Sequence, residues 1–205
     1  MMSDDLRAED VLAAYGISVE EEAGDEYRGV VVLAECAAGA VSEAAVGALG
    51  IGREIADTFG ARLEALILGG GEQEAAAAIR LGADAAVIAD VPPKYEQASW
   101  ATAMASAVEQ RKAEVVVLGG SDIACDIGPR VAQRLDTGLI AGVRQARAEA
   151  DERLVVAIVP LYGGRLLGEF AIPAKRPQMI CLAEGAGRVP TEDRSREGEI
   201  ERLAA

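Results

Sequence analysis

Short apolar runs alternate with longer amphipathic stretches along residues 29–135. Helical periodicity covers the stretches at about residues 42–59, 72–81 and 96–112, and a fourth helix is expected to begin at Pro129. The apolar runs between them are typical of strands buried on both faces: Val30–Ala34, Leu63–Leu68, Ala85–Ala89 and Val115–Leu118. Strand and helix therefore repeat, and each connection is long enough for a right-handed crossover. The pattern predicts an α/β fold of three layers, α/β/α, around a mostly parallel, doubly wound, Rossmann-like sheet, with these four strands in the order 3-2-1-4.

The pattern changes after Gly142. Two strand-like runs, Leu154–Val159 and Arg165–Ala171, are joined by a glycine-containing turn and predict a late β-hairpin. Gln178–Ala183 is expected to be a final strand. We expect the hairpin and this strand to extend past the compact core, which favours an obligate partner or a homo-oligomer. The remaining residues, 186–205, form a polar tail that is expected to be solvated and helical near its end.

The N-terminal residues, 1–28, form an acidic extension. Nine acidic residues and two arginines lie there, so this segment carries half of the net charge of −14. A short helix is expected at residues 4–15, and the segment is either a partly ordered extension or a docking arm for a partner. The expected organisation is thus an extension at 1–28, an α/β domain at 29–185 and a tail at 186–205.

Composition excludes several classes of function. The negative charge repels nucleic acids and anionic membranes, no apolar run is long enough to cross a bilayer, and the acidic N-terminus does not resemble a signal peptide, so a soluble cytoplasmic protein is expected. The chain has no histidine and three cysteines without CxxC spacing, so no metal site is expected. No set of residues resembles a catalytic apparatus, which indicates a protein that is not an enzyme.

Candidate binding chemistry gathers between residues 114 and 142, where a strand, a glycine turn and a helix follow one another. In open α/β sheets ligands bind at such turns, because backbone N–H groups and the helix N-terminus attract anions. The candidate cofactor-binding residues are Gly119, Gly120, Ser121, Asp126, Gly128 and Arg130. Asp122, Asp126 and Glu35 oppose a phosphate there, and Asp126 is expected to cap the helix instead. A plain structural turn and a nucleotide or anion site both remain open.

Two further pairs in this region have more than one interpretation. Arg130 and Arg134 share a helix face, which is either solvated or in contact with a partner subunit or an anionic cofactor. Cys36 follows the first strand and Cys125 follows the fourth. These strands are commonly neighbours in a doubly wound sheet, so the two thiols could be close, although two unremarkable reduced thiols are the simpler interpretation.

Four motifs in register resemble one known family. They are Val31-Val32-Leu33-Ala34-Glu35, the run Pro129-Arg130-Val131-Ala132 with Arg134-Leu135 and Thr137-Gly138-Leu139, then Tyr162-Gly163-Gly164, and Arg176-Pro177-Gln178-Met179. Together they cover about residues 29–185 and resemble the N-terminal domain of electron transfer flavoprotein alpha subunits. The resemblance implies an adenine-nucleotide-hydrolase-like fold and a role as scaffold or partner subunit in flavin-based electron transfer. Val159, Ala183-Glu184 and Gly142 depart from the polar residues usual in that family, and so does Cys125.

The resemblance also implies cofactors and partners. In the family a C-terminal domain holds FAD; here that domain is expected to be absent, so no cofactor is expected in the isolated chain and FAD would come from a partner or a separate domain. The implied partner is an electron transfer flavoprotein beta-type subunit or a separate FAD-binding subunit. Two alternatives stay open. The first is a standalone module binding AMP or ATP, since the beta subunits share the fold and bind AMP, and the second is a ligand-free homodimerisation domain.

Overall fold

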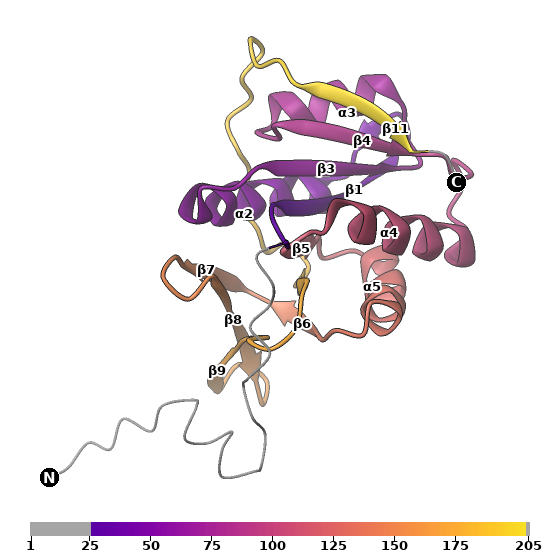
Figure 1. The fold of residues 1–205 in the computed structure, drawn as a ribbon. Helices are drawn as coiled ribbons and strands as arrows, with labels where there is room; N and C mark the ends of the chain where they lie inside the picture. Colours follow the sequence, from indigo (N-terminus) through magenta and orange to yellow (C-terminus); the bar gives the residue numbers. More distant parts are fainter. Residues whose placement is uncertain (1–25, 204–205) are drawn as a thin grey trace, which may run out of the picture.

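A computed structural model describes residues 26–203 and shows an α/β domain with a smaller sheet on one side (Figure 1). The first half of the chain alternates strand and helix as predicted. The strands of this half are β1 (Val30–Ala37), β2 (Ala40–Val41), β3 (Leu63–Leu68), β4 (Ala85–Ala89) and β5 (Val115–Leu118). The helices are α2 (Glu43–Phe59), α3 (Glu72–Arg80), α4 (Gln97–Arg111) and α5 (Asp122–Arg134).

The second half of the chain is built mainly of strands. They are β6 (Leu139–Val143), β7 (Gln145–Glu149), β8 (Leu154–Leu161), β9 (Leu166–Phe170), β10 (Gln178–Leu182) and β11 (Glu199–Leu203). The main sheet has the order β11-β4-β3-β1-β5-β10-β6, with β2 paired to β1. All neighbours along this order are parallel. The predicted parallel order of the first four long strands, β4-β3-β1-β5, is confirmed.

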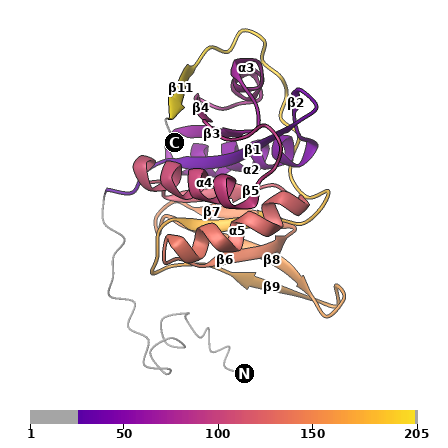
Figure 2. The ribbon, with the colours of Figure 1, turned by 90° about the vertical axis from the view of Figure 1, so that its right-hand side faces the viewer.

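Helices cover both faces of the main sheet, which confirms the three-layer fold. Alternate residues of β1 serve the two cores: Val30 and Val32 pack in the core with α2 and α3, whereas Val31 and Leu33 pack in the core with α4 and α5. This division follows from the period of two along a strand. Figure 2 shows α4 and α5 in front of the sheet. The helices α2 and α3 lie on the opposite face.

The late hairpin is confirmed as β8 and β9, which pair in antiparallel fashion. Together with β7, which also pairs with β8, they form a separate three-stranded sheet. Its inner residues Val155 and Ala157 are buried in the same core as α2. This small sheet therefore occupies the place of a further helix beside α2, with β9 at its outer edge (Figure 1).

The prediction that the strand at Gln178–Ala183 extends past the core is wrong. It forms β10, fully buried between β5 and β6 in the main sheet. The sequence analysis also gave no strand at β6, β7 or β11. The strands β6 and β11 pair in parallel with strands far away in the sequence, so no local turn marks them, whereas β7 pairs in antiparallel fashion with β8. The helix expected near the end of the tail is instead β11, which pairs with β4.

The helix after β5 begins earlier than predicted. Ser121, rather than Asp126, is its N-cap, because the Ser121 hydroxyl accepts a bond from the amide of Ala124 at 3.0 Å. Pro129 is consequently an interior residue of α5 and not its first residue. The helix ends at Arg134 with Leu135 as its C-cap, three residues before Gly138. The start of α2 is as predicted, with Ser42 capping through the amide of Ala45.

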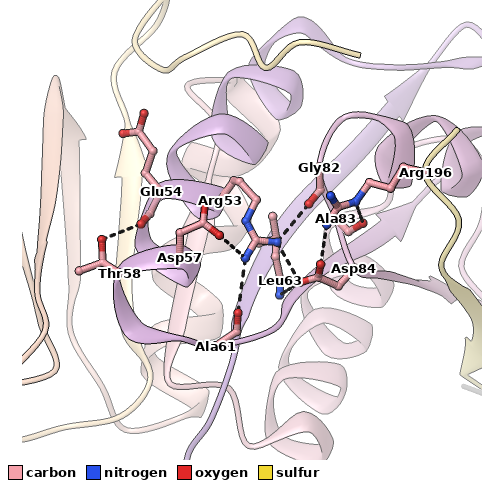
Figure 3. Close-up of polar contacts among 10 residues, drawn as sticks. All are labelled: Arg53, Glu54, Asp57, Thr58, Ala61, Leu63, Gly82, Ala83, Asp84 and Arg196. Atoms are coloured by element: carbon pink, nitrogen blue, oxygen red, sulfur yellow. Dashed lines mark hydrogen bonds and ion pairs between the residues drawn. The ribbon is translucent and has the colours of Figure 1, made fainter. Parts of the chain in front are cut away.

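The segment after β10 packs on the domain instead of extending into solvent. The amide of Arg188 donates to the carbonyl of Gly47 in α2 at 3.1 Å. Farther along, Arg196 donates from Nη2 to Asp84 Oδ1 at 2.5 Å (Figure 3). Asp84 Oδ2 accepts from the amide of Leu63 at 2.8 Å and from Arg53 at 2.9 Å. Burial alone would raise the pKa of Asp84, but these bonds hold it below its usual range.

Candidate functional site

The strand order reverses between β1 and β5, and the carboxyl ends of these two strands define the switch point of the sheet. The chain leaves β1 toward α2 on one face and leaves β5 toward α5 on the other. The N-caps of the two helices, Ser42 and Ser121, both lie at this edge. Ligands of open α/β sheets bind at such an edge, so this is the first place to test for a site.

Glu35 occupies the space between the two N-caps. Its side chain is buried, with 4% of the residue exposed, and Ser42 donates to its Oε1 at 3.2 Å. Burial raises the pKa of Glu35, and the hydroxyls of Ser121 and Ser42 oppose that rise through hydrogen bonding. A helix N-terminus carries about half of a positive charge, so two of them favour the carboxylate. The protein's own acidic side chain thus sits where an anionic ligand would bind.

The two glycines of the turn are packed against backbone. A Cβ on Gly119 would lie 2.5 Å from the carbonyl oxygen of Ala44, and a Cβ on Gly120 would lie 2.3 Å from that of Ala183. These glycines therefore allow close approach of α2 and of the segment after β10. Of the six candidate residues, Gly119, Gly120 and Ser121 lie together at the switch point, in a turn that the chain itself covers.

The other three candidates lie along α5. Gly128 is buried, and a Cβ there would be 3.2 Å from the side chains of Leu118 and Leu139. Asp126 accepts hydrogen bonds from Tyr95 and Gln97 and pairs with Arg130. The bond from Tyr95 is the main reason that the pKa of Asp126 is lowered. Asp126 and Arg130 thus hold the loop before α4 against α5 and do not join the glycine turn.

Arg134, farther along the same helix, also has a partner. Arg134 donates from Nη1 to the Thr102 hydroxyl at 2.9 Å, which joins α5 to α4. All three cysteines are free thiols. The thiol neighbour of Cys125 is Cys181 in β10, and not Cys36. Cys36 donates to the carbonyl of Ala34 within its own strand.

A second polar centre, which the sequence analysis missed, attaches the small sheet to the main one. Glu114 is buried and receives two bonds from Arg153, Nε to Oε1 at 2.8 Å and Nη2 to Oε2 at 2.5 Å. Gln178 is also buried; its Oε1 accepts from the amide of Val155 at 2.8 Å and its Nε2 donates to the carbonyl of Arg153 at 2.9 Å. The only sequence signal is a polar residue directly before an apolar run, Glu114 before Val115–Leu118 and Gln178 before residues 179–182.

The outer strand of the small sheet presents an apolar surface. We call it the β9 surface and define it by its exposed large apolar side chains, Tyr162, Leu166, Leu167 and Phe170. Side chains alternate along a strand, so Leu167 lies on the face of β9 opposite to Leu166 and Phe170, and the surface wraps around the edge of the sheet. Leu167 has 69% of its area exposed. Large apolar side chains exposed along an edge strand commonly mark a protein interface, because a monomer otherwise leaves them in water. This surface is the strongest candidate for contact with another protein.

The glycine turn at the switch point is closely packed by the backbone of other segments. A Cβ alone would collide with backbone at Gly119 and Gly120, and the carboxyl group of Glu35 lies beside the N-cap of α2. The arrangement does not fit a dinucleotide bound there. None of the helices in residues 26–203 has the length and apolar character that crossing a membrane requires.

Comparison with known proteins matches residues 30–205 to the model of the electron transfer flavoprotein domain. The electron transfer flavoprotein subunit alpha of Megasphaera elsdenii is 32% identical over 178 residues, which cover 85% of this chain and 53% of that protein. Protein FixB of Clostridium saccharobutylicum is 33% identical over 162 residues, covering 78% and 48%. The acryloyl-CoA reductase electron transfer subunit beta of Anaerotignum propionicum is 32% identical over 159 residues, covering 65% and 43%. The chain thus spans about half the length of these relatives.

Proposed function

The chain belongs to the electron transfer flavoprotein family, and from this premise we propose that it acts as an alpha-type subunit, an electron-transfer component and not a catalyst. Relatives named as electron transfer flavoprotein subunit alpha support the role. In this proposal residues 30–203 serve as a scaffold, and flavin is held outside them, by another domain or by a partner subunit. The lack of space at the glycine turn supports that division.

The partner is an electron transfer flavoprotein beta-type subunit, and the β9 surface is where it binds. The observation that carries this proposal is the exposure of Leu166, Leu167 and Phe170 on one edge strand. An interface needs a central apolar cluster that becomes desolvated, and a few such residues supply most of the binding energy. Arg147 and Glu169 form an ion pair at 3.0 Å on the same face of the small sheet as Leu167 and supply a polar rim there.

Leu167→Asp is expected to weaken binding of the beta-type subunit at least about tenfold, which corresponds to about 1.4 kcal/mol. A carboxylate at the centre of an apolar interface must be desolvated without a partner. Titration calorimetry with the purified beta-type subunit measures the effect. Val189→Asp is the matched control, because Val189 is similarly exposed, at 74%, but lies in the segment after β10.

Equal affinities for Leu167→Asp and wild type would place the partner elsewhere. Light scattering on the chain alone tests the homodimer. If the wild type dimerises and Leu167→Asp is monomeric, the β9 surface binds a second copy of this chain.

For the switch point we propose that AMP, ATP and FAD bind weakly or not at all, since Glu35 already neutralises the two helix N-termini. The full negative charge of one carboxylate offsets about half a positive charge from each of the two helix ends, so no net positive charge remains there to attract a phosphate. Calorimetry is expected to show no micromolar binding by the wild type. Glu35→Gln, which keeps the size of the side chain, is expected to bind phosphate-containing ligands more tightly than the wild type.

Glu184→Gln is the control for this experiment, because it removes one negative charge near Gly120 but from an exposed position. Micromolar affinity for AMP in the wild type, lost in Gly120→Val, would contradict the proposal and support the standalone nucleotide-binding module.

A further inference from the structure

Two thiols meet where β10 passes the start of α5. Cys181 is in register with Leu118, the last residue of β5, and its thiol donates to the carbonyl of Gly119 at 3.5 Å. The thiol of Cys181 therefore faces the turn that leads from β5 into α5. Cys125 lies one helical turn after the N-cap, and its amide donates to the carbonyl of Ser121 at 3.0 Å. The register thus places Cys181 against the turn before α5, and the thiols of Cys181 and Cys125 are close enough to interact.

The two thiols differ in their access to solvent. Cys125 is exposed, whereas only 1% of the area of Cys181 is exposed. Burial raises the pKa of Cys181 to about 12, and the neighbouring Cys125 adds to that rise. A buried neutral thiol is inert toward oxidants in solution, while an exposed thiol is open to them. This arrangement, an accessible thiol beside a protected one, is typical of an attacking and a resolving cysteine.

We propose that Cys125 and Cys181 form a reversible disulfide when the protein meets a peroxide. The Cys125 thiolate attacks one oxygen of hydrogen peroxide and forms an S–O bond while the O–O bond breaks, so that Cys125 becomes a sulfenic acid. The other oxygen leaves as hydroxide, which is protonated to water. The sulfur of Cys181 then attacks the sulfenic sulfur, forms the S–S bond, and loses its proton as the hydroxyl group departs as a second water. Two thiols are oxidised and one hydrogen peroxide is reduced to two waters. A small dithiol restores both thiols by exchange.

The disulfide would fasten α5 to β10 at the switch point. Cys36 does not take part, because it lies on β1, with β5 between β1 and β10, and its thiol bonds within its own strand. The bridge would enclose the Gly119–Ser121 turn, whose N-cap serine also approaches Glu35. The inference is independent of the proposed electron-transfer role, since it rests only on the two thiols and their access to solvent.

The experiment treats the full-length protein with a small excess of hydrogen peroxide and counts free thiols after denaturation. The expected count falls from three to one, the intact mass falls by about 2 Da, and a non-reduced digest contains a Cys125–Cys181 cross-linked peptide. Dithiothreitol restores three thiols. Cys36→Ser is the matched control and is expected to lose both remaining thiols in the same way.

Cys125→Ser is expected to abolish the fast loss of thiols without disturbing the core, because this side chain is exposed. Three results would overturn the inference. They are a Cys125–Cys125 link between two chains, a link that includes Cys36, or oxidation of Cys125 to the sulfinic acid while Cys181 remains a free thiol. Each of them would mean that the two sulfurs do not reach bonding geometry in solution.

Discussion

Gln178→Leu is expected to lower the free energy of unfolding by about 1–3 kcal/mol, because the buried amide of Val155 would lose its side-chain acceptor. The carbonyl of Arg153 would lose one of two side-chain donors and keep the other, Arg176. The side chain of Gln178 is 1% exposed and bonds the amide of Val155 and the carbonyl of Arg153. Leucine fills the same volume but offers neither a donor nor an acceptor. Urea unfolding measures the total change, and amide hydrogen exchange of Val155 measures the local one.

Gln133→Leu is the matched control. Gln133 is exposed on α5, and the same substitution there is expected to change stability by no more than about 0.5 kcal/mol. If Gln178→Leu left the stability and the exchange of Val155 unchanged, the small sheet would be held by its apolar contacts alone. If the prediction holds, the mutation also loosens β7–β9, and it is expected to weaken the partner that we propose for the β9 surface.

The strands of the first half of the chain could be predicted because strands buried on both faces consist almost entirely of apolar residues. Val115–Leu118 is a run of four branched apolar residues, and every one of them is buried in β5. Glu199–Leu203 gave no such signal because three of its five residues are charged. As an edge strand β11 keeps these side chains in solvent, where Glu201 pairs with Arg111 and Arg202 pairs with Glu72. A polar segment in which a few apolar residues alternate with charged ones is therefore easily interpreted as a solvated tail, although it forms an edge strand.

The start of α5 could not be fixed from local signals alone. Pro129 is an acceptable first residue of a helix, and Ser121 is an acceptable N-cap, so the two signals compete. The structure resolves the conflict in favour of Ser121, which puts Pro129 in the interior, where the carbonyl of Cys125 lacks its usual helical donor. Packing of Ile127 and Val131 in the core offsets that loss.

The glycines of the candidate site show why a binding site could not be predicted from a local motif. A glycine turn after a strand is compatible with phosphate binding and with close packing, and only the residues opposite the glycine distinguish the two. For Gly119 and Gly120 those residues are Ala44 and Ala183, each more than 60 residues away in the sequence. The sequence therefore shows where the glycines lie, but the role of each glycine depends on a tertiary contact that the sequence does not show.

Gly50→Ala is expected to destabilise the protein and to release the segment after β10 from α2. A Cβ at Gly50 would lie 1.8 Å from the carbonyl oxygen of Arg188 and 2.8 Å from its carbonyl carbon. Both atoms belong to the backbone, so no side-chain rotation relieves the overlap. Moving this segment also removes the bond from the Arg188 amide to Gly47 and the ion pair of Arg188 with Glu54. We expect a loss of about 1–3 kcal/mol, typical of overpacking.

The sign of the change in stability on Gly50→Ala distinguishes close packing from helix propensity, because helix propensity alone predicts that the variant is more stable. In an interior helical position, alanine is favoured over glycine by roughly 0.5–1 kcal/mol when the added methyl group meets open space. Thr58→Ala, at an exposed position of the same helix, tests that background and is expected to be neutral or slightly stabilising. Urea unfolding compares the variants, and trypsin cleavage after Arg188 and Arg194 reports release of the segment. A Gly50→Ala protein that is more stable than the wild type and equally resistant to trypsin would show that the segment does not pack on α2 in solution.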